Sequence, residues 1–310
     1  MSEKKRPHKE VNRITKILDQ SLPADERFPV DIQKVALELT PLFNDDPITD
    51  VQGHSLSRFE GALAKDPEGD RWAIFYNNNI QHSGRINFTL AHELGHYMLH
   101  RNEVGPEGFE CGKKDMLNPD SVYKKREEEA NIFAANLLMP IHDFRMQIEK
   151  ETFSFDLLSH CADRYGVSLT SALLRWLEFT SKRAIAVFSE EGYMHWAKSS
   201  NKAFKSGKYF ATRSGPIEVP DNSQAAEQSF SFDARDGIHH GPGVWFEDEA
   251  VIEHTIYSEE SEKTLTVLLL DPVGGYTCFD EQPELDCVFH TKSATHSTRI
   301  LPPIPRESCQ

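Results

Sequence analysis

Two histidines and a glutamate in the segment FTLAHELGHYMLH (88–100) have the types and spacing of a catalytic metal centre. On an α-helix, residues four apart lie on the same face, one turn from each other. His92 and His96 can therefore present two imidazole nitrogens to one zinc ion, and Glu93 can take a proton from a water on that ion. The motif predicts a zinc hydrolase with His92 and His96 as metal ligands and Glu93 as general base.

The residues around the motif favour a half-buried helix over a solvated helix on which this spacing arose by chance. Apolar residues recur at helical spacing and give the segment one face to bury. They are Phe88, Leu90, Ala91, Leu94 and Leu99. Gly95 costs about 1 kcal/mol relative to alanine inside a helix, so its position between the ligands indicates close approach of another element or of a substrate.

A catalytic zinc site needs a third protein ligand and an open position. The best segment for it is EEEANIFAANLLMP (127–140), whose apolar residues recur at helical spacing and whose proline marks the helix end. Glu127, Glu128 and Glu129 are all candidates, unless they only place acids near the positive end of the helix dipole. Glu127 has a modest advantage, because Asn131 lies one turn further on and can hydrogen-bond a ligand.

His100 is a further candidate ligand, one turn beyond His96. Eight residues from His92 the helix has turned by about 80°, so we expect His100 at the helix end or beside the substrate. A second oxyanion donor is common in such sites, and spacing favours none of the candidates. They are Tyr97, Tyr123 and His142.

The two segments together resemble the ImmA/IrrE family of metallopeptidases. The resemblance covers roughly residues 29–180 and includes the preceding segments PVDIQKVALEL (29–39) and FEGALAKDPEGDRWAIFYNNN (59–79). It implies a mostly helical, zincin-like domain with a small sheet. Members are typically zinc peptidases, and several cleave helix-turn-helix repressors, so the resemblance implies a stress-response protease that cleaves a cytoplasmic repressor or antitoxin.

The resemblance also implies roles for individual residues. His92 and His96 match the two histidine ligands, Glu93 the general base and Glu127 the third ligand, with zinc as the cofactor. Asn131 belongs to the same ExxAN pattern and is expected to hydrogen-bond a ligand from behind. The alternative to a peptidase is a binding module that keeps the fold and holds a partner without cleaving it.

The length of 310 residues and the change in residue pattern after residue 182 predict two domains in an α+β chain. A zinc peptidase domain is expected over 11–181, with helices over 11–20, 29–40, 88–101, 122–138 and 141–149 and strands within 57–78. The alternating stretch 72–76 reads as a strand, either in the core or as an edge for an extended peptide. The segment 102–122 is expected to be a loop, and residues 182–310 a β-rich domain of unknown role that begins with two strands joined at Glu190-Glu191-Gly192.

A helical pair over 155–181, whose first helix is expected to end at Gly166, closes the first domain and has the arrangement of a helix-turn-helix. Reading of DNA is disfavoured because Arg175 is the single cation of its second helix. In the second domain, His239 and His240 do not fit a recognised zinc pattern, nor does the set Cys278, Cys287 and His290.

Composition excludes several classes of protein. The net charge of −15 argues against broad binding of nucleic-acid phosphates and suits a basic protein substrate. No apolar run reaches the length of a membrane span, and the first residues lack the apolar core of a signal peptide. Five scattered cysteines form no disulfide framework, so we expect a reducing cytoplasm.

Overall fold

The computed structural model describes residues 6–56, 59–67, 69–103, 122–229 and 231–272. They divide into two compact units, the first made of 6–144 with Ala162–Ser168 and the second of 145–161 with 169–272. The chain combines helices with two separate sheets, which confirms the predicted α+β class. The predicted domain boundary after residue 181 stays a prediction. Among the described residues, no helix has the length and apolar character to cross a bilayer.

The first unit contains a three-stranded sheet in which β3 is the central strand. β1 runs parallel to β3 and β2 antiparallel to it. The bounds are β1 (Ile48–His54), β2 (Gly61–Lys65) and β3 (Trp72–Asn77). Trp72 and Ile74 in β3 are buried, so the alternating stretch belongs to the core and is not an edge. β2, which packs against the helix over residues 83–100, instead has one side that pairs with no described strand.

Helices make up the rest of the first unit. They are α1 (Pro7–Ser21), α2 (Ile32–Lys34) continuing through a π-helical turn (Val35–Leu39) into α3 (Thr40–Phe43), α4 (Ser83–His100), α5 (Val122–Leu138) and the start of α6 (Ile141–Ile148), whose residues from Arg145 on belong to the second unit. The first helix begins four residues before the prediction, because Pro7 at its first position is already set to a helical φ. α4 begins five residues earlier than predicted. Of the predicted loop over 102–122, residues 104–121 lie outside the described residues.

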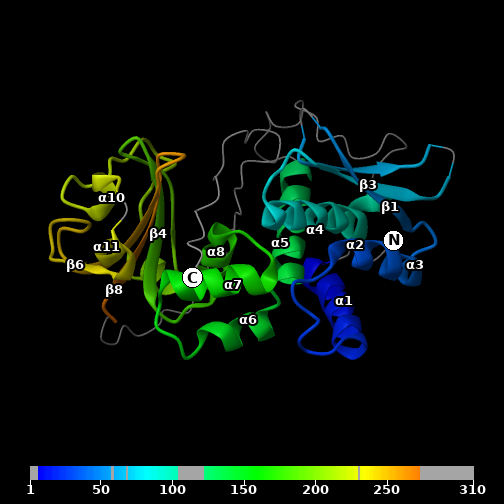
Figure 1. Ribbon diagram of the computed structural model, residues 1–310, viewed down its shortest axis with the longest axis horizontal. Helices are drawn as coiled ribbons and strands as arrows, with labels where there is room; N and C mark the ends of the chain where they lie inside the picture. The colour runs from blue at the N-terminus through cyan, green and yellow to red at the C-terminus, as the bar shows by residue number, and fades with distance from the viewer. Residues whose placement is uncertain (1–5, 57–58, 68, 104–121, 230, 273–310) are drawn as a thin grey trace, which may run out of the picture. The chain divides into compact units, whose positions relative to one another are not determined.

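The second unit is built on a five-stranded antiparallel sheet with the order β5-β4-β8-β7-β6 (Figure 1). Its strands are β4 (Arg183–Glu190), β5 (Tyr193–Ser199), β6 (Ile238–His240), β7 (Val251–Ser258) and β8 (Lys263–Leu270). β4 and β5 form the predicted hairpin, whose turn residues Glu191 and Gly192 both have positive φ. This sheet confirms the expectation of a β-rich part after the helices.

Helices precede and cover this sheet. They are α7 (Phe155–Tyr165), α8 (Leu169–Phe179), α9 (Asn201–Lys205), α10 (Gln224–Glu227) and α11 (Phe232–Asp236). Gly166, with φ +59°, ends α7 as predicted. One apolar cluster joins the sheet to the short helices. Its buried members are Ile185, Val187, Met194, Ala203, Val219, Ala225, Trp245, Val251, Leu268 and Leu270.

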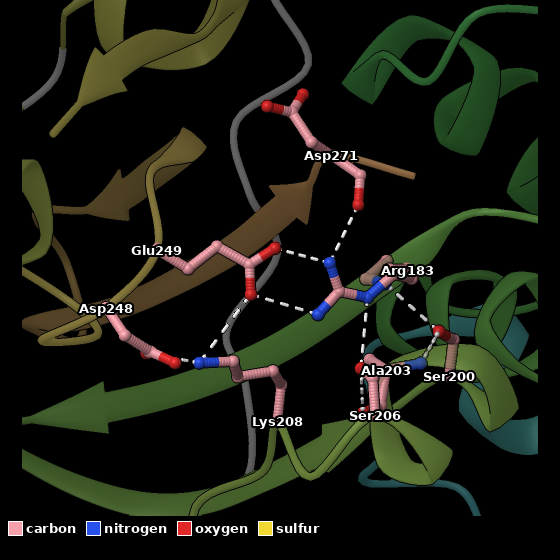
Figure 2. Close-up of polar contacts among 9 residues, drawn as sticks. Arg183, Ser200, Ala203, Ser206, Lys208, Asp248, Glu249 and Asp271 are labelled. Carbon is pink, nitrogen blue, oxygen red and sulfur yellow. Dashed lines mark hydrogen bonds and ion pairs between the residues drawn. The ribbon is translucent and has the colours of Figure 1, made fainter. Parts of the chain in front are cut away.

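A polar network fixes the ends of β4 and β8 to neighbouring loops (Figure 2). The buried Arg183 guanidinium donates to Ser206 Oγ at 3.0 Å and to the Asp271 carbonyl at 2.7 Å. It also forms a bidentate ion pair with Glu249. Lys208 joins the same network through Asp248 and Glu249. Arg183, Lys208, Asp248 and Glu249 each have a charged partner in this network, which therefore holds loops together.

In the first unit, Asp143 of α6 links the end of α7 to the core. Its carboxylate accepts two hydrogen bonds of 2.8 Å from Arg164 and one of 2.5 Å from Tyr165. Burial raises the pKa of Asp143, but the hydrogen bonds from Arg164 and Tyr165 outweigh it and hold this pKa below its usual value. Its charged form therefore stabilises the fold.

The Asp143→Asn variant tests this linkage. Because the folded pKa is lowered, the stabilisation is present above the unfolded value of about 3.9 and is lost as the pH falls through the folded pKa. We expect the variant to lose about 1–3 kcal/mol of unfolding free energy at neutral pH, and less at pH 3. Urea unfolding at both pH values measures this, and an equal loss at both would contradict it.

Candidate metal centre

Three side chains from two helices meet at one point. The Nε2 atoms of His92 and His96 in α4 lie 2.9 Å apart. The carboxylate of Glu127 in α5 lies 3.3 Å from His92 Nε2 and 3.1 Å from His96 Nε2. One ligand atom from each residue lies within 4.8 Å of the others, so the three donors can converge on one ion.

The close crossing of α4 and α5 brings these residues together, as Figure 1 shows. Gly95 lies at the crossing, where an added Cβ would come within 3.2 Å of the Ala130 backbone and 3.1 Å of the Phe133 ring. The glycine expected to admit another element therefore admits α5. A larger residue would separate the helices, and Glu127 would then move away from the histidines.

Each histidine is also held through its other ring nitrogen. His92 Nδ1 lies 2.9 Å from Asn131 Oδ1, in the position predicted for Asn131. His96 Nδ1 lies 3.2 Å from His100 Nδ1, and His100 Nε2 lies 3.0 Å from Glu129 Oε2. His100 is the last residue of α4, the first of the two places expected for it, and its side chain, only 2% exposed, lies behind His96.

Glu93 is buried beside the start of β2. A Cβ added to Gly61 would stand 2.9 Å from Glu93 Oε1 and 2.5 Å from Thr89 Cγ2. Gly61 therefore leaves the space that the Glu93 carboxylate occupies. Sequence reasoning missed this glycine, because only the packing of β2 on α4 reveals its role.

Burial and the charges of neighbouring side chains shift the pKa values of the residues at this centre. Burial lowers the pKa of His92, but the hydrogen bond and charge of Glu127 outweigh it and raise that pKa to about 9. Burial lowers the pKa of His96 to about 4. Burial raises the pKa of Glu127, but its contacts with His92 and His96 outweigh burial and keep that pKa below its usual value. Burial raises the pKa of Glu93 to about 7.

This donor set fits a divalent metal. It offers two imidazole nitrogens and a carboxylate, which is a ligand set used in catalytic zinc sites. The Glu127 carboxylate and the two imidazole nitrogens lie 2.9–3.3 Å apart in a buried site, where a charge needs a partner of opposite sign. A cation bound to all three would be such a partner for the carboxylate. The assignment of these residues as ligands stays a prediction.

The other candidates from the sequence lie elsewhere. Glu129 pairs with His100, and Glu128 is outside the three-residue group. Tyr97 points to the Asp46 carbonyl at 2.9 Å, and His142 is exposed on α6. Among the described residues, His92, His96 and Glu127 form the only group of at least three His, Cys, Asp or Glu whose donor atoms lie within 4.8 Å of one another, so His239 and His240 do not join one. Cys278, Cys287 and His290 lie outside the described residues.

Part of the chain is similar to known proteins. Residues 45–177 match the family model described as the IrrE N-terminal-like domain. Metallopeptidase ImmA from Bacillus subtilis (strain 168) is 34% identical over 88 residues, an alignment that covers 28% of this chain and 45% of that relative. The chain thus spans less than half the length of the relative. Matched residues include the crossing of α4 and α5.

One solved structure, titled Mycobacterium tuberculosis transcriptional regulator, shares the fold. The TM-score is 0.52 at 13% sequence identity, over 85% of this chain and 76% of that one. At this identity the likeness concerns the fold alone.

Substitutions of Gly95 test the role of the helix crossing. We expect Gly95→Val to weaken zinc binding by about tenfold or more, because the branched side chain meets the Ala130 backbone and displaces Glu127. Gly95→Ala, which needs a shift of only a few tenths of an ångström, should have a smaller effect. Zinc titration against a chelator gives the affinities, and thermal unfolding of the metal-free variants reports folding. Wild-type affinity in a folded Gly95→Val variant would contradict the account.

Proposed function

Because residues 45–177 form a domain of the ImmA/IrrE metallopeptidase family, we propose that this protein is a zinc-dependent endopeptidase. The observation that carries the proposal is the convergence of His92, His96 and Glu127 next to the buried carboxylate of Glu93. Three donors on two packed helices, with an acid–base group beside them, have the composition of a hydrolytic zinc site.

In this proposal His92 Nε2, His96 Nε2 and the Glu127 carboxylate hold the metal. Zinc would supply Lewis acidity, which polarises a peptide carbonyl and acidifies water. The protein positions both histidines from behind, through Asn131 for His92 and through His100 for His96.

Glu93 is the proposed general base. Burial raises its pKa to about 7, so the carboxylate can accept a proton from the attacking water near neutral pH. The same group can then return the proton to the amine of the leaving peptide. Gly61 supports this role, because it leaves the carboxylate room beside β2.

The unpaired side of β2 is the proposed binding edge for the substrate. Within the described residues β2 pairs only with β3, and its first residue adjoins Glu93. An extended peptide added along this edge would form main-chain hydrogen bonds, which is a general mode of peptide recognition. The scissile bond would then lie beside the general base.

We propose a basic cytoplasmic protein as the substrate, most simply a helix-turn-helix repressor or an antitoxin. Two observations support it, the family resemblance and the net charge of −15, which attracts a basic partner. Direct binding of DNA through the pair α7–α8 loses its support. Arg175, the cation on which it depended, is 1% exposed and pairs with Glu178 at 2.9 Å.

A binding module that holds a partner without cleaving it is the second candidate. The family resemblance favours it as much as it favours the peptidase, since the fold and the ligands would be the same. The raised pKa of Glu93 favours the peptidase, because a module that only binds has no need of a buried proton acceptor there.

The Glu93→Gln variant separates the two functions. We expect it to reduce cleavage by at least about 100-fold, because the amide cannot accept the proton, while zinc content stays at the wild-type level. New protein N-termini in cells that express the wild type or the variant reveal cleavage. Glu38→Gln, on an exposed helical surface, is the matched control. If the biological effect survives in Glu93→Gln, the peptidase proposal fails and the binding module replaces it.

A further inference from the structure

We propose that His100 and Glu129 form a hydrogen-bonded pair that holds the His96 imidazole in the Nδ1–H tautomer, which leaves the lone pair of the ring on Nε2 as the metal donor. Both are then positioning residues for the centre, and neither touches the metal or the substrate. The inference rests on the proposed function, since it concerns the same centre. It adds two residues that sequence reasoning left as a helix-end histidine and a rival ligand.

The three side chains form a continuous line from the site into the protein. His96 Nε2 faces Glu127 at 3.1 Å, and its Nδ1 faces His100 Nδ1 at 3.2 Å. His100 Nε2 faces Glu129 Oε2 at 3.0 Å. The side chains of His96 and His100 are 0% and 2% exposed, so water does not compete for these contacts.

The chemistry of the donors and acceptors determines which nitrogen carries the hydrogen in each of these contacts. An ionised carboxylate only accepts hydrogen bonds, so His100 Nε2 must carry the hydrogen that faces Glu129. In a neutral imidazole the other nitrogen is then an acceptor, so His100 Nδ1 accepts from His96 Nδ1. His96 Nδ1 therefore carries the hydrogen of its ring. The lone pair of His96 is left on Nε2, the atom that faces Glu127.

The two ligands are held by different means. His92 Nδ1 meets the neutral side-chain amide of Asn131, whereas His96 is connected through an imidazole to a carboxylate. A carboxylate behind a ligating histidine fixes the ring and makes it a stronger donor. His96 is the more deeply buried ligand, so its orientation has the greater need of support from the protein.

The geometry disfavours the alternative in which His100 is itself a ligand. Both of its ring nitrogens already face partners, and it does not belong to the group whose donor atoms lie within 4.8 Å. To reach the metal, His100 would have to leave Glu129 and pass His96.

Zinc affinity of four variants tests the pair. We expect His100→Leu and Glu129→Ala to bind zinc about 10–100-fold more weakly than the wild type, because the Nδ1–H tautomer is no longer favoured. His100→Gln restores an acceptor for His96, and should recover part of the affinity. Glu128→Ala, next to Glu129 and outside the line, is the matched control and should bind as the wild type does. Competition with a chromophoric chelator measures all of them, and thermal unfolding of the metal-free proteins reports folding.

Nitrogen NMR of the histidine rings gives a second readout that lost packing alone would not move. The metal-free wild type should show His96 protonated on Nδ1, and this signature should weaken in Glu129→Ala and in Glu129→Gln. Wild-type affinity in folded His100→Leu and Glu129→Ala, or His96 protonated on Nε2 in the wild type, would overturn the inference. If the wild type binds no zinc, the proposed function fails, while the tautomer measurement still decides on the pair.

Discussion

The centre depends on how closely α5 can approach α4. The motif on α4 supplies two donors by local geometry alone, but the third comes from a different helix that must pass within reach of both. Gly95 permits this approach, since no side chain separates α4 from the backbone of Ala130. The roughly 1 kcal/mol that glycine costs in a helix is thus offset by the packing it allows. The same crossing also brings Asn131 to His92 and Glu129 to His100.

The site contains more buried titratable groups than a core of this size tolerates without compensation. His96 and Glu93 are both buried, and Glu127 is nearly so. A buried charge is stable only when it is paired or binds a metal. Here Glu127 and His92 stabilise each other, while burial shifts the pKa of Glu93 up and that of His96 down. This balance of buried charges is the one expected of a site that binds a cation.

Sequence reasoning predicted the parts of this account that depend on local spacing. The i and i+4 histidines, the helix over 122–138 and the hairpin of β4 and β5 all follow from short patterns of residue type. It missed β1, whose sequence ITDVQGH has few apolar residues and pairs with β3 only through long-range contacts. It also missed β7, in which the buried Glu253 interrupts the apolar pattern. That carboxylate is stabilised by donors from Ala225, Trp245 and Thr255, which no local pattern reveals. His100 could have been noticed, because it repeats the four-residue spacing from His96, but its partner Glu129 comes from the other helix.

The claim that Glu127 completes a metal centre with His92 and His96 is tested most directly by zinc content. The measurement compares purified wild type with Glu127→Ala and Glu128→Ala after equilibration with zinc and removal of the excess. The account predicts about one zinc per chain in the wild type and in Glu128→Ala, and a large loss in Glu127→Ala. Equal zinc in all three proteins, or none in the wild type, would contradict it.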